Sequence, residues 1–329
     1  MQQTVIHLTR SAKKYVDRDG LSLFYFNQIS DALANISPQN IVETFLDIKG
    51  GQWGGTVLHY AAVNGHIKLI EKIFANLSEA ERFELLSSTN KDSANVLQEA
   101  AGHSQAHTLR FILDSVPNFC SSKLIEHRTS FNYTTVHRAS FSVTGNYDVR
   151  VLEILLNHAP ETKWLLFERT NDGSTAIHES VYYQELTAVQ VILSRLPTTT
   201  EKMRIMSIQA NNGYTVLHTA ARYSNADIIQ ALLDPLPVTS RVRLLTECAN
   251  DGRNPLKIAL KYNESRKHRD RVVEILRFYS CTAASLKEEA RNTRNEGNFH
   301  VGRIQNLCTK RICNYSQLID IFLQFNYVR

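Results

Sequence analysis

The chain is poor in the residues that build disulfide frameworks, metal sites and phosphate-binding loops. Only five of its 329 residues are cysteine and 13 are glycine. An odd number of cysteines scattered over a long chain argues against a disulfide framework and favours a reducing compartment. The close pair Cys308 and Cys313 has no second Cys or His pair nearby, so no metal site is expected there. We therefore expect neither a metal nor a cofactor.

Long apolar runs are also absent. No run approaches the roughly 20 residues needed to cross a bilayer, and the first 20 residues lack the apolar core of a secretory signal. With 43% hydrophobic and 21% charged residues, the composition is that of a folded globular chain. We expect a cytoplasmic protein without a membrane span.

Catalytic motifs are missing as well. The sequence contains no glycine-rich phosphate loop, no His-Glu-x-x-His and no Gly-x-Ser-x-Gly. His103 and His107 are one helical turn apart, the spacing of a zinc pair, but no third ligand lies beside them. The expectation is a protein that is not an enzyme and has no small-molecule substrate.

Basic residues are concentrated at the C-terminal end. From Arg253 onward, 15 Lys and Arg stand against 7 Asp and Glu, whereas the rest of the chain has 22 against 25. Such asymmetry is typical of a surface for an acidic partner, although a solvated helical face is a commoner cause.

One sequence pattern occurs six times between residues 51 and 280. Its clearest copies are GGTVLHYAAVNGHIKLIEKIF (54–74), DGSTAIHESVYYQELTAVQVIL (172–193) and NGYTVLHTAARYSNADIIQALL (212–233). Equivalent positions, here called the anchors, recur every 39 to 41 residues, which indicates a repeat architecture. The anchors are His59, Gln98, His137, His178, His218 and Lys257.

Each copy resembles the ankyrin repeat, in which an Asp-Gly turn precedes Thr-Pro-Leu-His, an Ala-rich first helix and a Val/Leu-rich second helix. The resemblance implies an all-α solenoid of about six repeats that binds proteins. The proline of the tetrapeptide survives only as Pro255, and the period is six to eight residues longer than the usual ~33. This lengthened form is similar to ankyrin proteins that intracellular bacterial pathogens deliver into host cells. It implies an effector that is secreted into the host cytoplasm and engages a host protein.

The extra residues follow the second helix and are predicted to form a short third helix. Segments such as SEAERFELLSS and TSRVRLLTEC carry apolar residues at helical spacing. At about 1.5 Å per residue, they span roughly two turns. Prolines, which end one helix and allow the next to start, precede four of these segments at Pro117, Pro160, Pro197 and Pro237.

The two ends differ from the repeats. Residues 1–50 are predicted to be a helical cap or degenerate repeat, 51–280 the solenoid and 281–329 a helical cap, because a solenoid must close its terminal apolar faces. The alternative is an enzyme or separate module in the basic C-terminal segment, with the repeats as its targeting unit. Capping is favoured because the short terminal segments leave little room for a catalytic domain of typical size.

The histidine anchors suggest chemistry, but their spacing argues against it. Equivalent residues of stacked repeats lie about 8–10 Å apart. Zinc–nitrogen bonds are about 2 Å long, and a general base must come within about 3 Å of its target. The ankyrin resemblance instead implies that a histidine such as His218 hydrogen-bonds within the turn and first helix, whose start the threonine caps.

The resemblance also implies where a partner binds. The concave face of an ankyrin stack is formed by the residue before the threonine and by the two positions after the Ala-Ala pair of the first helix; we call these positions the recognition face. From the third copy onward they are aromatic and basic, the types enriched in interface hot spots. The predicted binding residues are Tyr133, Phe141, Tyr182, Tyr183, Tyr214, Arg222, Tyr223, Arg253, Lys261 and Tyr262.

These positions predict a non-enzymatic scaffold whose partner is a protein, in particular an acidic or extended segment. The alternative for single rings is packing in the seams between repeats. Nucleic acid fits the Tyr, Arg and Lys mixture, but no recognised motif accompanies it, so a nucleic-acid partner is not expected.

Overall fold

The computed structural model describes residues 42–43, 46, 49, 53–158, 160–223, 226–262 and 269–280. Over these ranges the regular structure is helical, apart from isolated bridge residues such as the pair Thr89 and Asn95. The all-α fold predicted from the repeat pattern is confirmed. The predicted caps at 1–50 and 281–329 lie almost entirely outside the described residues.

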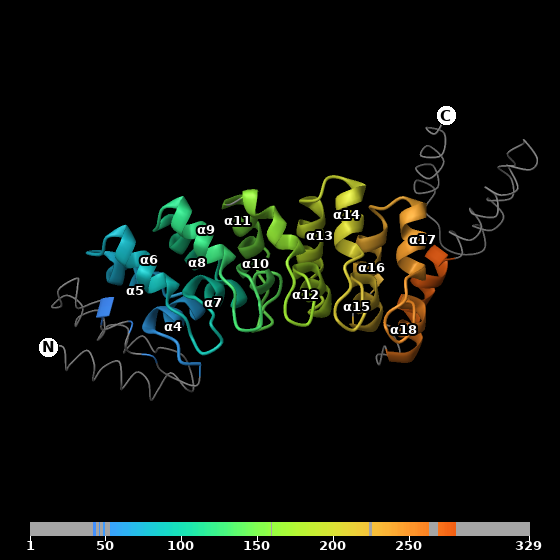
Figure 1. Cartoon of the computed structure of the whole chain (residues 1–329), viewed down its shortest axis with the longest axis horizontal. Helices are drawn as coiled ribbons and strands as arrows, with labels where there is room; N and C mark the ends of the chain where they lie inside the picture. The colour runs from blue at the N-terminus through green and yellow to red at the C-terminus, as the bar shows by residue number, and fades with distance from the viewer. Residues whose placement is uncertain are drawn as a thin grey trace, which may run out of the picture. The chain divides into compact units, whose positions relative to one another are not determined.

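The first five copies contain three helices each, in the predicted order (Figure 1). The first helices are α4 (Val57–Val63), α7 (Val96–Gly102), α10 (Thr135–Arg138), α12 (Ala176–Tyr182) and α15 (Val216–Tyr223), followed in the sixth copy by α18 (Pro255–Tyr262). The second helices are α5 (Ile67–Phe74), α8 (Ala106–Asp114), α11 (Arg150–His158), α13 (Leu186–Ser194) and α16 (Ala226–Leu233), and residues 269–280 are helical at the matching place in the sixth copy. The third helices are α6 (Glu79–Ser87), α9 (Asn118–Glu126), the 3-10 helix η1 (Pro160–Phe167), α14 (Thr199–Met206) and α17 (Val238–Thr246).

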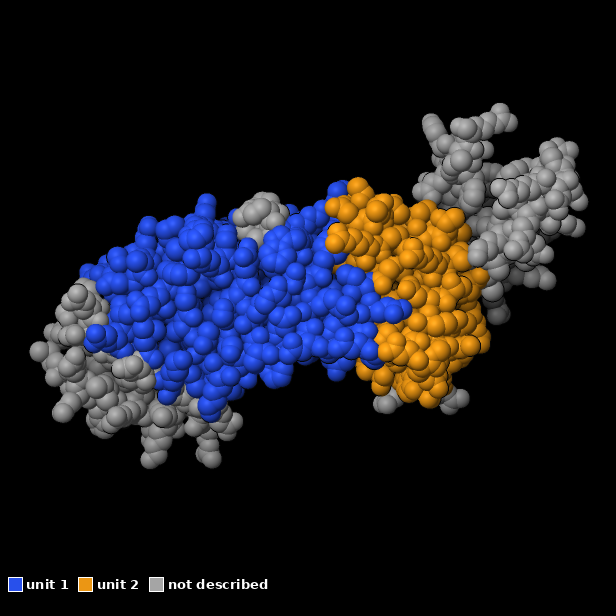
Figure 2. All heavy atoms as spheres, in the orientation of Figure 1, with its two compact units in different colours: residues 1–197, 208–212 blue, residues 198–207, 213–329 orange. Residues whose placement is uncertain are grey.

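The chain divides into two compact units (Figure 2). Unit 1 comprises residues 1–197 and 208–212, and unit 2 comprises residues 198–207 and 213–329. In unit 1, α4 packs on α7, α7 on α10 and α10 on α12, whereas in unit 2 α15 packs on α18. Within each unit, the first helices of successive copies therefore stack on one another, as expected for a repeat architecture.

A capping box starts the first helix in the first four copies. The anchor is the third residue of the helix, and its side chain accepts the backbone N–H of the cap residue. In return, the side-chain oxygen of the cap residue accepts the backbone N–H of the anchor. The N–H groups of the first turn have no partner within the helix, so the two bonds satisfy donors that would otherwise be unpaired. The cap residues are Thr56, Asn95, Thr134 and Thr175.

The second helices supply much of the core. In α5 the side chains of Leu69, Ile70 and Ile73 have no exposed surface, and Leu109 and Ile112 repeat this arrangement in α8. Each fully buried side chain of this kind contributes about 1.5–3 kcal/mol relative to an exposed one. The apolar residues of the second helices therefore form the face that packs against neighbouring helices.

The predicted third helices are present, and an arginine ties two of them to the second helix. Arg82 of α6 donates from Nη2 to the carbonyl of Phe74 at 3.2 Å, and Arg241 of α17 donates from Nε to Leu233 at 2.9 Å. Both carbonyls belong to the last residue of a second helix, where no intrahelical donor remains. Each arginine thus holds its third helix across the C-terminal end of the second.

The third copy departs from the prediction. Its first helix, α10, ends at Arg138 after four residues, so Phe141 lies beyond the helix on which it was expected. Beyond Arg138 the Ser140 hydroxyl donates to the Val136 carbonyl at 2.7 Å, and the Tyr147 hydroxyl donates to the Ala139 carbonyl at 3.1 Å. Side-chain donors of this kind compete with the N–H groups that would continue a helix. The third helix of this copy is a 3-10 helix and not an α-helix.

Candidate functional site

The histidine anchors serve the structure, as predicted, and His59 and His218 also link successive copies. Nδ1 of His59 accepts the backbone N–H of Thr56 at 3.1 Å and therefore also accepts the Thr56 hydroxyl proton at 2.9 Å. This leaves Nε2 as the donor, 3.1 Å from the carbonyl of Ala94 in the next copy. Nε2 of His218 makes the matching contact with the carbonyl of Arg253, also at 3.1 Å, whereas Nε2 of His137 lies 3.1 Å from the carbonyl of Glu168, directly after the third helix of its own copy.

These imidazoles are unsuited to proton transfer near neutral pH. Burial lowers the pKa of His59 and His218 and lowers that of His137 to about 4. In the described ranges no three His, Cys, Asp or Glu side chains gather in a way that could hold a metal. His103 of the His103/His107 pair instead contacts Glu99, with Nδ1 3.5 Å from its carboxylate. His103 thus has a contact with the helix that it caps.

Four predicted residues of the recognition face meet in unit 1 and form what we call the aromatic cluster: Tyr133, Phe141, Tyr182 and Tyr183. The rings of Phe141 and Tyr183 stack with centroids 4.2 Å apart and planes 8° apart. Tyr182 meets Tyr183 edge to face at 5.1 Å, and Tyr133 meets Phe141 in the same way at 6.4 Å. Phe141 is buried, but Tyr182 and Tyr183 are 49% and 44% exposed. Phe141 therefore supports Tyr183, which in turn contacts Tyr182, and both tyrosines remain accessible to solvent.

A buried carboxyl group lies beside this cluster. Glu179 of α12 is 7% exposed and accepts a hydrogen bond from the hydroxyl of Tyr133. Burial, reinforced by the charge of Asp172, raises the pKa of Glu179 to about 7. The same burial raises the pKa of Tyr133 and Tyr183, so both phenols stay neutral.

We expect Glu179→Gln to stabilise unit 1 above neutral pH. The folded pKa of about 7 exceeds the model-compound value of 4.5. Between these two pH values the folded state therefore binds more protons than the unfolded state, and its stability falls as pH rises. The amide keeps the shape and a hydrogen-bond acceptor for Tyr133 without this loss. Urea unfolding at about pH 8 should show a gain of up to about 3 kcal/mol, with little difference near pH 4.5.

The matched control is Glu185→Gln, because Glu185 is half-buried in the same unit and its pKa is raised by burial alone. It should change stability less. If Glu179→Gln had the same effect at both pH values, Glu179 would not be titrating as described.

The other six predicted residues meet in unit 2 and form what we call the cation–tyrosine cluster: Tyr214, Arg222, Tyr223, Arg253, Lys261 and Tyr262. The Arg222 guanidinium lies 4.8 Å from the ring centroid of Tyr223 and 4.7 Å from that of Tyr262. It also donates to the Tyr214 hydroxyl at 3.3 Å. Tyr214 is buried, whereas Tyr223 is 38% exposed. Tyr214 thus positions Arg222, and the ring of Tyr223 remains accessible to solvent.

Sequence reasoning missed a charged pair on the first helices of unit 1. Glu99 is buried and bonds Asn90 at 3.0 Å and Arg138 of the next copy at 3.3 Å. The signal was available, because the position directly after the anchor is Glu99, Arg138 and Glu179 in successive copies. Charges of alternating sign at one repeat position predict attraction between neighbouring repeats.

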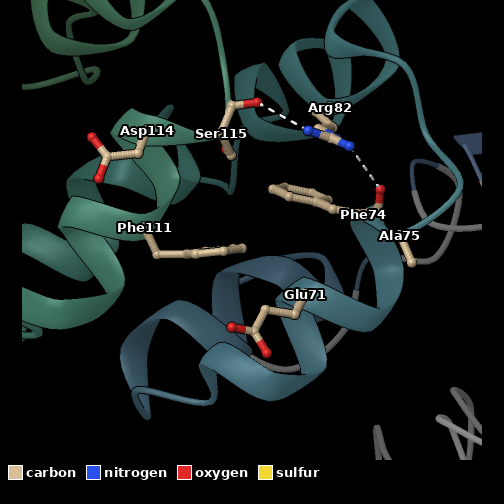
Figure 3. A pocket seen from close by; sticks show the side chains of 7 residues that line it. All are labelled: Glu71, Phe74, Ala75, Arg82, Phe111, Asp114 and Ser115. Atoms are coloured by element: carbon tan, nitrogen blue, oxygen red, sulfur yellow. Dashed lines mark hydrogen bonds between the residues drawn. The ribbon is translucent and has the colours of Figure 1, made fainter.

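A hollow of about 350 Å³ opens between the second helices α5 and α8 of unit 1 (Figure 3). The rings of Phe74 and Phe111 lie nearly parallel there, with centroids 6.2 Å apart. Arg82 donates to the carbonyls of Phe74 and Ser115 across the hollow. Glu71, Ala75 and Asp114 complete its lining. Because the arginine is bound to backbone carbonyls, we assign these residues a packing role.

Comparisons with known proteins agree with this geometry. A family profile described as ankyrin repeat matches residues 212–239. The solved ankyrin repeat domain of Bcl-3, a member of the IkappaB protein family, matches with a TM-score of 0.50 at 17% identity, over 82% of this chain and 97% of that one. The chain has the ankyrin-repeat fold. An ankyrin repeat domain from Acinetobacter baumannii matches with a TM-score of 0.47 at 16% identity, over 68% of this chain and 96% of that one.

A search of curated protein sequences finds no match to this ankyrin-repeat chain. Where its helices are described, none is long and apolar enough to span a bilayer.

Proposed function

We propose that this ankyrin-repeat protein is a non-enzymatic scaffold that binds a protein through the recognition face. The observation that carries the proposal is the exposure of ordered aromatic rings at the predicted positions. Tyr182, Tyr183 and Tyr223 are all more than one third exposed, yet each is held by a neighbouring ring or guanidinium. Aromatic side chains fixed before binding lose little entropy on binding and bury large areas.

The two clusters favour different features of a partner. The aromatic cluster of unit 1 presents rings above a buried carboxyl group that is partly neutral at pH 7, which suits apolar or aromatic side chains. The cation–tyrosine cluster of unit 2 presents Arg222, Arg253 and Lys261 among tyrosines, which suits an acidic segment. An extended, acidic stretch of a partner protein fits the chemistry of unit 2.

The lengthened repeat is the feature that supports the more specific proposal of a bacterial effector acting in a host cytoplasm. The third helices that lengthen each copy are well formed, for example α6 and α17. A host protein would then be the partner. Capture of the same host protein by the wild-type chain, and its loss with the variants below, is the test of this proposal.

Tyr223→Ala should weaken a captured partner at least about tenfold, because removing a central interface ring commonly removes about 2 kcal/mol of binding energy. Lys261→Ala should have a smaller effect, mainly on the association rate and on salt dependence. The measurement is the dissociation constant of the purified partner, determined by titration calorimetry at two salt concentrations.

The matched control is Phe119→Ala in α9, since Phe119 is 68% exposed but lies on a third helix outside the recognition face. It should leave affinity unchanged. Full affinity in the double variant Tyr182→Ala/Tyr223→Ala would contradict the proposed surface. A loss of affinity with Phe119→Ala would show that the partner binds the third helices instead.

A further inference from the structure

Three cationic side chains surround one aromatic ring in unit 2. The guanidinium carbons of Arg222 and Arg253 lie 4.7 Å and 5.6 Å from the ring centroid of Tyr262, and the Lys261 ammonium lies 4.5 Å from it. The ring attracts each cation through its quadrupole. It does not neutralise their charges, so the three cations repel one another.

One carboxylate offsets part of this charge. Asp251 forms an ion pair with Arg253 at 2.5 Å. Three cations against one anion leave the site with a net charge of +2. The site therefore matches a ligand group that carries two negative charges.

The hydrogen-bond donors of the site are held in place before a ligand arrives. Arg222 is fixed by the rings of Tyr223 and Tyr262 and by its bond to the Tyr214 hydroxyl. Arg253 donates to the Tyr262 hydroxyl at 3.4 Å, and that hydroxyl keeps its own proton as a donor. Fixed guanidinium groups present paired N–H donors that fit the oxygens of a phosphate or carboxylate.

We propose that the cation–tyrosine cluster binds the phosphate group of a phosphorylated side chain in an extended partner segment. This inference rests on the proposed function, since it names the chemistry that unit 2 recognises in a protein partner. A phosphomonoester carries about −1.5 to −2 charges and three acceptor oxygens at pH 7, whereas Asp or Glu supplies one charge and two oxygens. Charge and donor number therefore both favour phosphate over a carboxylate.

A single compact cluster also favours a phosphopeptide over nucleic acid. Single strands are bound along grooves in which positive charge follows the backbone over several nucleotides and bases stack on successive rings. Here the charges converge on Tyr262, and each phosphodiester brings only one charge. Nucleic acid is accordingly a competing outcome of the experiment below.

The test uses the full-length chain and degenerate peptide libraries that differ only at a fixed central residue: phosphoserine, phosphotyrosine, glutamate, serine or tyrosine. Binding is followed by fluorescence polarisation, and single-stranded DNA is measured in parallel over a salt series. A phosphorylated library should bind at least about tenfold more tightly than the glutamate library. Backbone amide shifts should map that binding to residues 213–223 and 251–262.

Variants assign the effect to the cluster. Arg222→Gln and Arg253→Gln should each reduce phosphopeptide affinity at least about tenfold, and Arg222→Lys should recover only part of the loss because it restores charge without the paired donors. Arg243→Gln, which changes an exposed arginine on α17, should have no effect. Circular dichroism checks that each variant is folded. If Arg222→Gln does not fold, Arg253→Gln still tests the proposal.

Equal binding of the phosphorylated and glutamate libraries would overturn the phosphate assignment while leaving protein binding at this face intact. Stronger, steeply salt-dependent binding of the DNA would overturn it in favour of nucleic acid. Absence of binding to every library, together with a captured partner that ignores Tyr223→Ala, would contradict the proposed function itself.

Discussion

Replacing His137 with alanine is expected to destabilise unit 1 by about 4 kcal/mol. His137 has no exposed surface, and its ring bonds both the cap residue Thr134 and the carbonyl of Glu168 in the third-helix region. Alanine would remove both bonds, leave buried polar groups without partners and create a cavity. Urea unfolding at neutral pH measures the loss.

His137→Gln should be much milder, because the protein already uses glutamine at the equivalent anchor. Gln98 accepts the backbone N–H of Asn95 at 3.0 Å and donates to the carbonyl of Tyr133 at 3.1 Å. Gln98 also donates to the carbonyl of His127 at 2.8 Å, and His127 lies ten residues before the next anchor, as Glu168 does. Gln98 therefore makes counterparts of both His137 contacts. Glutamine at position 137 is therefore expected to keep most of the stability.

The same variant should reduce the acid sensitivity of the protein. His137 has a folded pKa of about 4 against 6.5 in a model compound, so the unfolded state binds the proton first. The stability that His137 contributes above pH 6.5 is lost as pH falls through this window, at up to about 1.4 kcal/mol per pH unit. Glutamine does not titrate, so the difference in unfolding free energy between variant and wild type reports the pH dependence due to His137 alone. The opposite pH dependence due to Glu179 is the same in both proteins and cancels.

An equal loss for alanine and glutamine would show that the imidazole ring itself is required, and not the pair of hydrogen bonds. An unchanged pH dependence in His137→Gln would show that His137 is not held neutral by burial.

Much of the fold could be predicted because each copy carries its own local signals. The cap residue and anchor of each first helix lie three positions apart, as with Thr56 and His59. These signals are short-range, so one sequence suffices to detect them. The third helices were detected in the same way, from apolar spacing and from prolines such as Pro117 and Pro237, which are the N-cap residues of α9 and α17.

The length of α10 was not predicted, because the copies were assumed to be equivalent. In a continuing helix the Val143 N–H would bond the Ala139 carbonyl, but it bonds the carbonyl of Gly102 in the preceding copy at 2.9 Å, and the Tyr147 hydroxyl donates to Ala139 at 3.1 Å. These contacts depend on residues outside the segment, so the pattern of one copy does not predict them.

The candidate site was predictable in its position but not in the burial of its members. Both Phe141 and Tyr214 were assigned to the recognition face, yet both are buried. Their burial depends on neighbours from other copies, such as Tyr183 against Phe141, which a single copy does not contain. The pairing of Glu99 with Arg138 was missed for the same reason, since it joins two copies.

Gly213 and Gly252 lie in the turns before two of the first helices. Gly213→Ala should destabilise unit 2 by about 3 kcal/mol, whereas Gly252→Ala should destabilise it by only about 1 kcal/mol. Both glycines have a positive φ, +81° and +73°, so both variants carry the same backbone strain. A Cβ at Gly213 would lie 2.4 Å from the backbone nitrogen of Asn250, whereas a Cβ at Gly252 has no atom within 4 Å. Ser93 adopts φ +58° at the equivalent position of the second copy, so a side chain is tolerated where space allows. Thermal unfolding of the two variants therefore separates the contact with Asn250 from the backbone strain, and equal losses would show that this close approach between successive turns does not limit the choice of residue.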